Sequence, residues 1–157
     1  MITQLWEAAD FVRRIHTQFR FGKLSRAPLR LLRFEVRGEL VECEWMVRPM
    51  DPWDETLPKD MGLRNQTLQA LQDALALREL LFEVLPAAQA AKFRAYRQAA
   101  GGSTELVITG NSSRKDKSPL RVASIAMRAK LCGLHFSLDD GVLEPLSAKG
   151  RKLEFAT

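Results

Sequence analysis

Few side chains of this sequence could bind a metal or act as a nucleophile, because its 157 residues include two cysteines and two histidines. Cys132 and His135 form a Cys-x-x-His pair, a spacing that two zinc ligands can use. Cys43 and His16 stand alone, so a four-ligand zinc site would need the fold to bring all four residues together. Cys43 falls among the inward residues of a predicted strand and Cys132 on an apolar helix face, where a thiol is unreactive. We therefore expect no metal site, no cofactor and no catalytic residue.

Arg78 is the next candidate for chemistry, because it lies within the apolar stripe of the helix predicted over 65–85. A buried guanidinium needs a negatively charged partner. One interpretation is structural: the side chain packs, and its head reaches an internal carboxylate such as Asp73 or Glu79. The other is a bound anion, which would make the protein a carrier or an enzyme for a small anionic ligand. The sequence leaves both interpretations open.

The net charge of +5 raises the question of nucleic-acid binding. Basic residues gather in two segments, 20–33 (RFGKLSRAPLRLLR) and 111–121 (NSSRKDKSPLR). In the first segment they are interspersed with leucines, which is typical of a strand with one solvated face. The second segment provides Arg114, Lys115 and Lys117 as candidate contacts to a phosphate backbone. Nucleic-acid binding is therefore an alternative, and the solvated-face interpretation is favoured over it.

Large side chains and prolines are concentrated in residues 45–58 (WMVRPMDPWDETLP), which hold two of the three Trp, two of the five Met and three of the seven Pro. The prolines keep this connection extended and stiff. Trp45 belongs to the inward set of a predicted strand, whereas Met46 and Arg48 alternate outward. Trp53 either seals an edge of the sheet or meets a partner. Met46, Arg48 and Trp53 have the composition of an interface core, so they are candidate partner-binding residues.

Hydrophobic periodicity indicates the elements that would position these residues. Apolar residues at helical spacing predict a first helix, with His16 on its buried stripe, and a second helix with Asn65 as its N-cap. The buried stripe of the first helix is predicted to contain Leu5, Ala8, Ala9, Val12, Ile15 and Phe19. The helices are predicted over 3–20, 65–85 and 119–132, and hairpins over 32–47, 91–110 and 135–146.

The segment 119–132 is apolar on two nearly opposite sides when it is drawn as a helix. One of these sides is formed by Leu120, Met127 and Leu131. A helix that is apolar on two sides is usually covered on both, and an isologous dimer is the commonest way to supply the second cover. These three residues are therefore candidate partner-binding residues of a homodimer. Part of the segment also alternates, so a strand is the alternative.

The predicted order of elements is αββ-αββ-αββ, and the single solvated face of the first hairpin favours antiparallel pairing. We predict an α+β fold with a mostly antiparallel sheet of about six strands and about three helices packed on one face. Residues 1–146 are expected to form a single domain and residues 147–157 a peripheral C-terminal tail.

The absence of several motifs argues against the classes of enzyme that depend on them. The sequence has no Gly-rich phosphate loop, dinucleotide fingerprint, His-Glu-x-x-His or Gly-x-Ser-x-Gly motif. Without a long apolar run or a signal-peptide pattern, the chain is expected to be cytoplasmic and to have no membrane partner. The prediction is a non-catalytic binding or protein-interaction module that forms a homodimer. The alternatives are a nucleic-acid-binding protein, and a small anionic-ligand carrier or enzyme centred on Arg78.

Overall fold

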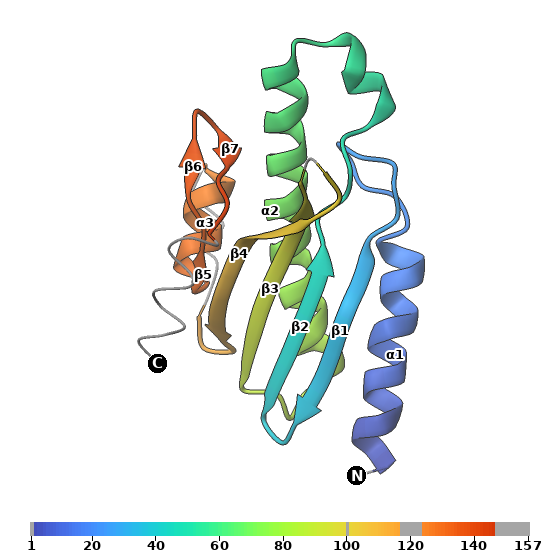
Figure 1. Ribbon diagram of the computed structural model, residues 1–157. Coiled ribbons are helices and arrows are strands. Elements are labelled where there is room, and N and C mark those ends of the chain that lie inside the picture. The colour runs from blue at the N-terminus through green and yellow to red at the C-terminus, as the bar shows by residue number, and fades with distance from the viewer. Residues whose placement is uncertain (1, 100, 117–123, 147–157) are drawn as a thin grey trace.

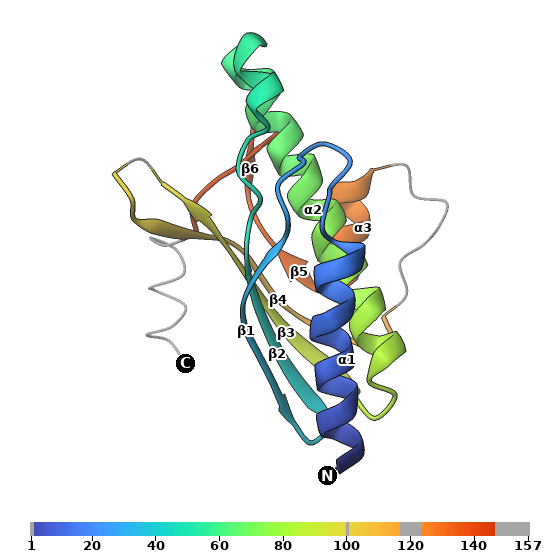
Figure 2. The ribbon, with the colours of Figure 1, turned by 90° about the vertical axis from the view of Figure 1, so that its right-hand side faces the viewer.

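Helices cover one face of a five-stranded sheet, which gives the protein a two-layer α+β fold (Figure 1, Figure 2). The computed structural model describes residues 2–99, 101–116 and 124–146. The helices in these ranges are α1 (Ile2–Gln18), the 3-10 helix η1 (Pro52–Thr56), α2 (Lys59–Val84) and α3 (Ile125–Leu131). The strands are β1 (Arg30–Arg37), β2 (Leu40–Met46), β3 (Ala90–Gln98), β4 (Thr104–Ser113), β5 (Leu134–His135), β6 (Leu138–Asp139) and β7 (Val142–Leu143).

The main sheet has the strand order β1-β2-β3-β4-β5, and β2 and β3 at its centre are parallel while the other pairs are antiparallel. The parallel pair depends on α2, because a parallel connection must carry the chain back along the sheet. Strands β6 and β7 form a separate two-stranded sheet. The predicted α+β class with helices on one face is therefore confirmed. The predicted six-stranded antiparallel sheet is corrected, within the described residues, to a mixed sheet of five strands beside a small hairpin.

The core lies between the sheet and the helices. Trp45 of β2 is fully buried, as predicted, and its ring meets Phe93 of β3 edge to face, with 6.0 Å between the ring centroids. Phe11 of α1 stacks on Phe34 of β1 with 4.5 Å between the centroids. These aromatic pairs join α1 to the edge strand and β2 to its parallel neighbour.

The predicted first helix is confirmed, and Ile15 and Phe19 of its predicted stripe are buried, whereas the burial of Phe11 was not predicted. The buried side chains are Phe11, Ile15 and Phe19, at a regular spacing of four residues. Leu5 is 71% exposed, and His16 is exposed as well, so neither belongs to the core. The stripe is narrow because α1 lies at the side of the helix layer, next to the edge strand (Figure 1).

Helix α2 begins earlier than predicted and is buried on several sides. Its N-cap is Pro58, and Asn65 lies inside the helix instead of capping it. Because α2 lies between α1 and α3 and over the sheet, its buried residues do not form a single stripe (Figure 2). A helix covered in this way can bury polar side chains if they find partners, and α2 buries both Asp73 and Arg78.

Charged side chains cover the face of the sheet that is turned away from the helices. Arg33 lies within 3.4 Å of carboxylate oxygens of Glu42 and Glu44 on the neighbouring strand. Hydrogen bonds from Arg37 and Arg33 lower the pKa of Glu35 to about 2. The last basic residue of the first basic segment is therefore part of an ion-pair cluster on a solvated face.

Candidate functional site

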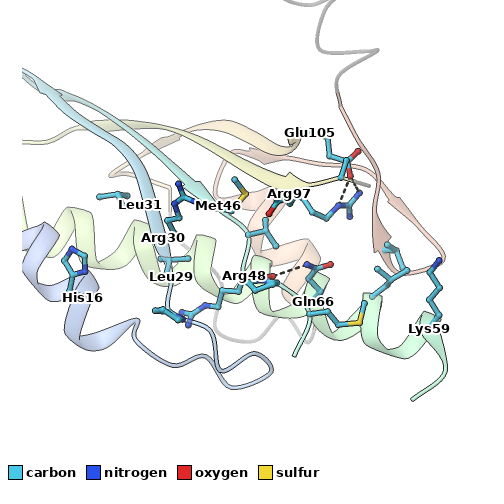
Figure 3. A pocket seen from close by; sticks show the side chains of 18 of the residues that line it. His16, Leu29, Arg30, Leu31, Met46, Arg48, Lys59, Gln66, Arg97 and Glu105 are labelled. Atoms are coloured by element: carbon cyan, nitrogen blue, oxygen red, sulfur yellow. Dashed lines mark hydrogen bonds and ion pairs between the residues drawn. The ribbon is translucent and has the colours of Figure 1, made fainter. Parts of the chain in front are cut away.

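A groove of about 1080 Å³ lies at the end of the sheet where β2 finishes (Figure 3). Its walls come from α1, from the chain next to β1 and β2, from the first turns of α2 and from the end of the β3–β4 hairpin. Most of the lining side chains are apolar. We call it the basic groove. Its lining includes Arg30, Met46, Lys59, Leu63 and Gln98.

The local sequence explains why the groove opens at this point. The ladder between β2 and β3 runs to Met46, and the amide of Val47 still donates to the carbonyl of Tyr96 at 2.7 Å. Pro49 has no N–H to continue the ladder, and the chain turns away towards η1. Strands β3 and β4 continue as a two-stranded hairpin that projects from the sheet (Figure 2). The space beside this hairpin is the basic groove.

The charges in the basic groove are mainly positive. Arg97 is neutralised within the protein, because its Nε and Nη2 donate to Glu105 at 2.8 and 2.6 Å. Arg30 and Lys59 are exposed, and neither forms an ion pair with an acid whose side chain the structure describes. The groove therefore combines an apolar lining with two uncompensated cations. Sequence reasoning did not single out Lys59, and the only signal for Arg30 was its place in the first basic segment.

Arg48 is buried, which corrects its predicted outward position. Its side chain is 2% exposed, and its Nε and Nη2 donate to the two carboxylate oxygens of Asp73 at 2.8 and 3.0 Å. The remaining nitrogen, Nη1, donates to the carbonyl of Ala27 at 2.8 Å. The strand alternation failed at this residue because β2 ends at Met46 and the chain then bends under α2. Both residues that were predicted to point outward, Met46 and Arg48, line the basic groove, but Arg48 is held in an internal ion pair with Asp73.

The partner of Arg48 is itself held by a hydrogen-bond network. The side-chain amide of Gln69 donates to Asp73 at 3.0 Å, and its oxygen accepts from the amide of Leu24 at 2.6 Å. Burial raises the pKa of Asp73, and the hydrogen bonds from Arg48 and Gln69 oppose this shift. The network ties the loop after α1 and the end of β2 to the middle of α2.

Arg78 is also buried, but it has no carboxylate partner in the described part of the chain. Its Nε donates to the hydroxyl of Ser112 at 2.5 Å, and its Nη2 donates to the backbone carbonyls of Ser113 and Asp116. The carboxylates that the sequence suggested are elsewhere, because Asp73 is paired with Arg48 and Glu79 is exposed. Arg78 therefore contributes an unneutralised positive charge to the helix layer.

One residue of the second basic segment, Arg114, binds backbone carbonyls within the protein. Arg114 donates from Nε to the carbonyl of Ala88 and from Nη2 to that of Leu85, each at 2.7 Å, so it satisfies carbonyls at and just beyond the end of α2. Lys115 is exposed. Lys117 lies outside the described residues. The three predicted phosphate contacts therefore do not form one described surface.

The predicted partner-binding residues outside the groove are exposed where they are described. Trp53 of η1 is 68% exposed, and the guanidinium of Arg26 lies 5.5 Å from the centre of its ring. Met127 and Leu131 of α3 are about half exposed. Leu120 falls outside the described ranges. The described part of the segment 119–132 is helical from Ile125, so α3 is shorter than predicted.

The cysteines and histidines are dispersed. Cys43 and Cys132 are both buried and free, and burial raises the pKa of the Cys43 thiol. His135 is exposed, as is His16. Among the residues that the structure describes, no group of three possible ligands could hold a metal ion.

Comparison of the chain with protein-family models, with curated proteins and with solved structures gives no match. None of the described helices is both long enough and apolar enough to cross a membrane.

Proposed function

We propose that the protein is a non-catalytic binding module whose basic groove holds an extended, acidic and apolar segment of a protein partner. The observation that carries this proposal is the pairing of a large apolar groove with two cations, Arg30 and Lys59, that no described acid neutralises. An apolar lining supplies binding free energy, and uncompensated charges at its margin select the sign of the partner.

The end of β3 favours an extended peptide as the occupant. Residues of a strand point their backbone groups to alternate sides, and Tyr96 forms the last ladder bond to the β2 side. Ala99 donates to Ser103, on the β4 side. The N–H and C=O of Gln98 therefore point towards the groove, where β2 has already ended. An extended segment entering the groove would continue the β2 ladder there, which is the mode of strand addition.

The C-terminal tail of the same chain does not have the chemistry of this occupant. Residues 147–157 (SAKGRKLEFAT) contain three basic side chains and one acidic side chain. Two uncompensated cations in the groove repel such a segment. An acidic partner is favoured by the same charges.

The proposal is tested with two fluorescent peptides of equal length, one alternating Leu and Glu and the other alternating Leu and Lys. Fluorescence anisotropy is expected to show binding of the acidic peptide and at least about tenfold weaker binding of the basic one. Leu63→Asp, at the groove, should weaken binding of the acidic peptide. Equal affinities for the two peptides, or no effect of Leu63→Asp, would overturn the proposal.

The same assay includes the alternatives that the sequence raised. A single-stranded oligonucleotide that binds more tightly than the acidic peptide, with an affinity that falls steeply as salt rises, would favour the nucleic-acid alternative. A native mass spectrum of the purified protein measures the proposed homodimer. The exposed Trp53, Met127 and Leu131 are the residues proposed to contact the second subunit.

A further inference from the structure

A second groove, of about 700 Å³, lies on the outer side of the helix layer. Its walls come from the end of α1 and the loop that follows, from the middle of α2 and from α3. It is termed the outer groove. Arg48 lines both grooves, so its ion pair with Asp73 lies between them. We infer that the outer groove binds a phosphate group through Arg78 and Arg128.

Arg78 brings a charge that the surrounding protein leaves unneutralised. It is 7% exposed, and two of its three nitrogens, Nε and Nη2, are bound to neutral oxygens. The third nitrogen, Nη1, has no hydrogen bond to any described residue. The side chain nevertheless lines the outer groove. The neutral oxygens hold the guanidinium in place, and its remaining donor is left for a ligand.

Arg128 of α3 supplies an independent observation. Its Nε is buried and has no hydrogen-bond partner, and its side chain lines the same groove. A buried donor without an acceptor is costly, and an acceptor brought by a ligand removes that cost. Trp45 Nε1 is the other such atom in the described residues, but it belongs to the core of the sheet and does not line the groove.

The nature of the ligand follows from the two guanidinium groups. Each guanidinium can donate hydrogen bonds to phosphate or carboxylate oxygens, and Arg78 has its Nη1 nitrogen left for this. The two guanidinium groups, with Lys23 at the edge of the groove, favour a doubly charged phosphate over a single carboxylate. Exposed Glu79 and Glu83 also line the groove. Glu83 lies 3.8 Å from Arg14, whereas Glu79 has no cationic partner among the described residues and opposes an anion.

The test is a titration with inorganic phosphate, monitored by isothermal calorimetry and by Tm, against sodium chloride of equal ionic strength. Phosphate but not chloride is expected to raise Tm, because a ligand that binds the folded state stabilises it. Arg128→Gln is expected to weaken phosphate binding at least about tenfold, since it removes one charged partner. It should not lower Tm in the absence of phosphate, because the Nε of Arg128 has no described hydrogen-bond partner to lose.

Glu79→Gln provides the opposite change in the same groove. It removes a negative charge and is expected to tighten phosphate binding several-fold. Arg33→Gln, on the solvated face of the sheet, is the matched control and should leave the affinity unchanged. The inference is overturned if phosphate gives no more heat or stabilisation than chloride, or if Arg128→Gln and Arg33→Gln have equal effects. Binding of phenyl phosphate more tightly than phosphate would identify a phosphate ester as the ligand, and equal binding a free ion.

Discussion

Two buried arginines of this protein, Arg48 and Arg78, line the same groove but have different partners. Arg48 meets both oxygens of Asp73, and its third nitrogen meets a backbone carbonyl, so its charge and all its nitrogens are satisfied. Arg78 meets a hydroxyl and two backbone carbonyls and has no carboxylate within 4.0 Å in the described residues. Arg48 therefore belongs to a complete internal ion pair. Arg78 is fixed in position by neutral oxygens, and its Nη1 has no described hydrogen-bond partner.

The difference shows that a buried charge can either be paired within the protein or remain available to an external ligand. An ion pair removed from water depends on both partners, and loss of one leaves the other buried and uncompensated. A guanidinium held by neutral oxygens is positioned without being neutralised, so an external anion still lowers its free energy. Arg48 is therefore expected to stabilise the fold, and Arg78 to combine a structural and a binding role.

The largest predicted effect is the loss of stability when the ion pair between Arg48 and Asp73 is broken. Asp73→Asn should lower the free energy of unfolding by about 3–5 kcal/mol, because it leaves the Arg48 guanidinium buried without a carboxylate. Urea denaturation measures the loss. The double variant Arg48→Met, Asp73→Leu should recover most of it, because it removes both charges together. A double variant that is less stable than Asp73→Asn alone would contradict this account of the pair.

Loss of Arg78 should cost less than loss of Asp73. Arg78→Met should lower the free energy of unfolding by about 1–3 kcal/mol, because it leaves neutral acceptors unsatisfied but no buried charge. The same urea experiment measures both variants, and the residual stabilisation by phosphate is measured alongside. A cost equal to that of Asp73→Asn would show that Arg78 has an ionic partner and would end the contrast between the two arginines.

A contact between an arginine and an aromatic ring at the surface can be compared with a similar contact in the interior. Arg26 lies 5.5 Å from the Trp53 ring at the surface, whereas Arg78 lies 5.2 Å from the buried Phe82 ring. Trp53→Ala should change the free energy of unfolding by no more than about 0.5 kcal/mol, because the ring is mostly exposed. Native mass spectrometry of this variant should show weaker assembly than in the unaltered protein. A large fall in Tm would place the ring in the core instead.

The smallest effect concerns an ion pair in water. The folded-state pKa of Glu35 is about 2, below its ordinary value of 4.5, so its contribution to stability is present above pH 4.5 and is lost as pH falls towards 2. Glu35→Gln should make the acid-induced loss of stability shallower in this window, as measured by urea denaturation at several pH values. An unchanged slope in Glu35→Gln would contradict the role of Arg33 and Arg37.

Much of the fold could be predicted from local sequence, and less of the candidate sites. Period and turn residues predicted the first two helix–hairpin units, because those signals lie within a few residues of one another. The parallel pairing of β2 and β3 could not be predicted, since it depends on where the long α2 returns the chain. The burial of Arg48 was missed because alternation holds only while a strand continues, and β2 ends just before it. Arg30 and Lys59 line one groove only because of the fold, so neither sequence segment alone indicated a shared groove.

The most direct test of the proposed function is to reverse the charges of the basic groove and measure which peptide it prefers. Arg30→Glu combined with Lys59→Glu should switch the preference from the Leu-Glu peptide to the Leu-Lys peptide and leave Tm nearly unchanged, because both side chains are exposed and unpaired within the described residues. The matched control is Arg33→Glu, away from the groove, which should keep the original preference. If the groove variant still prefers the acidic peptide, or if the unaltered protein shows no preference, the basic groove is not the binding site of an acidic partner.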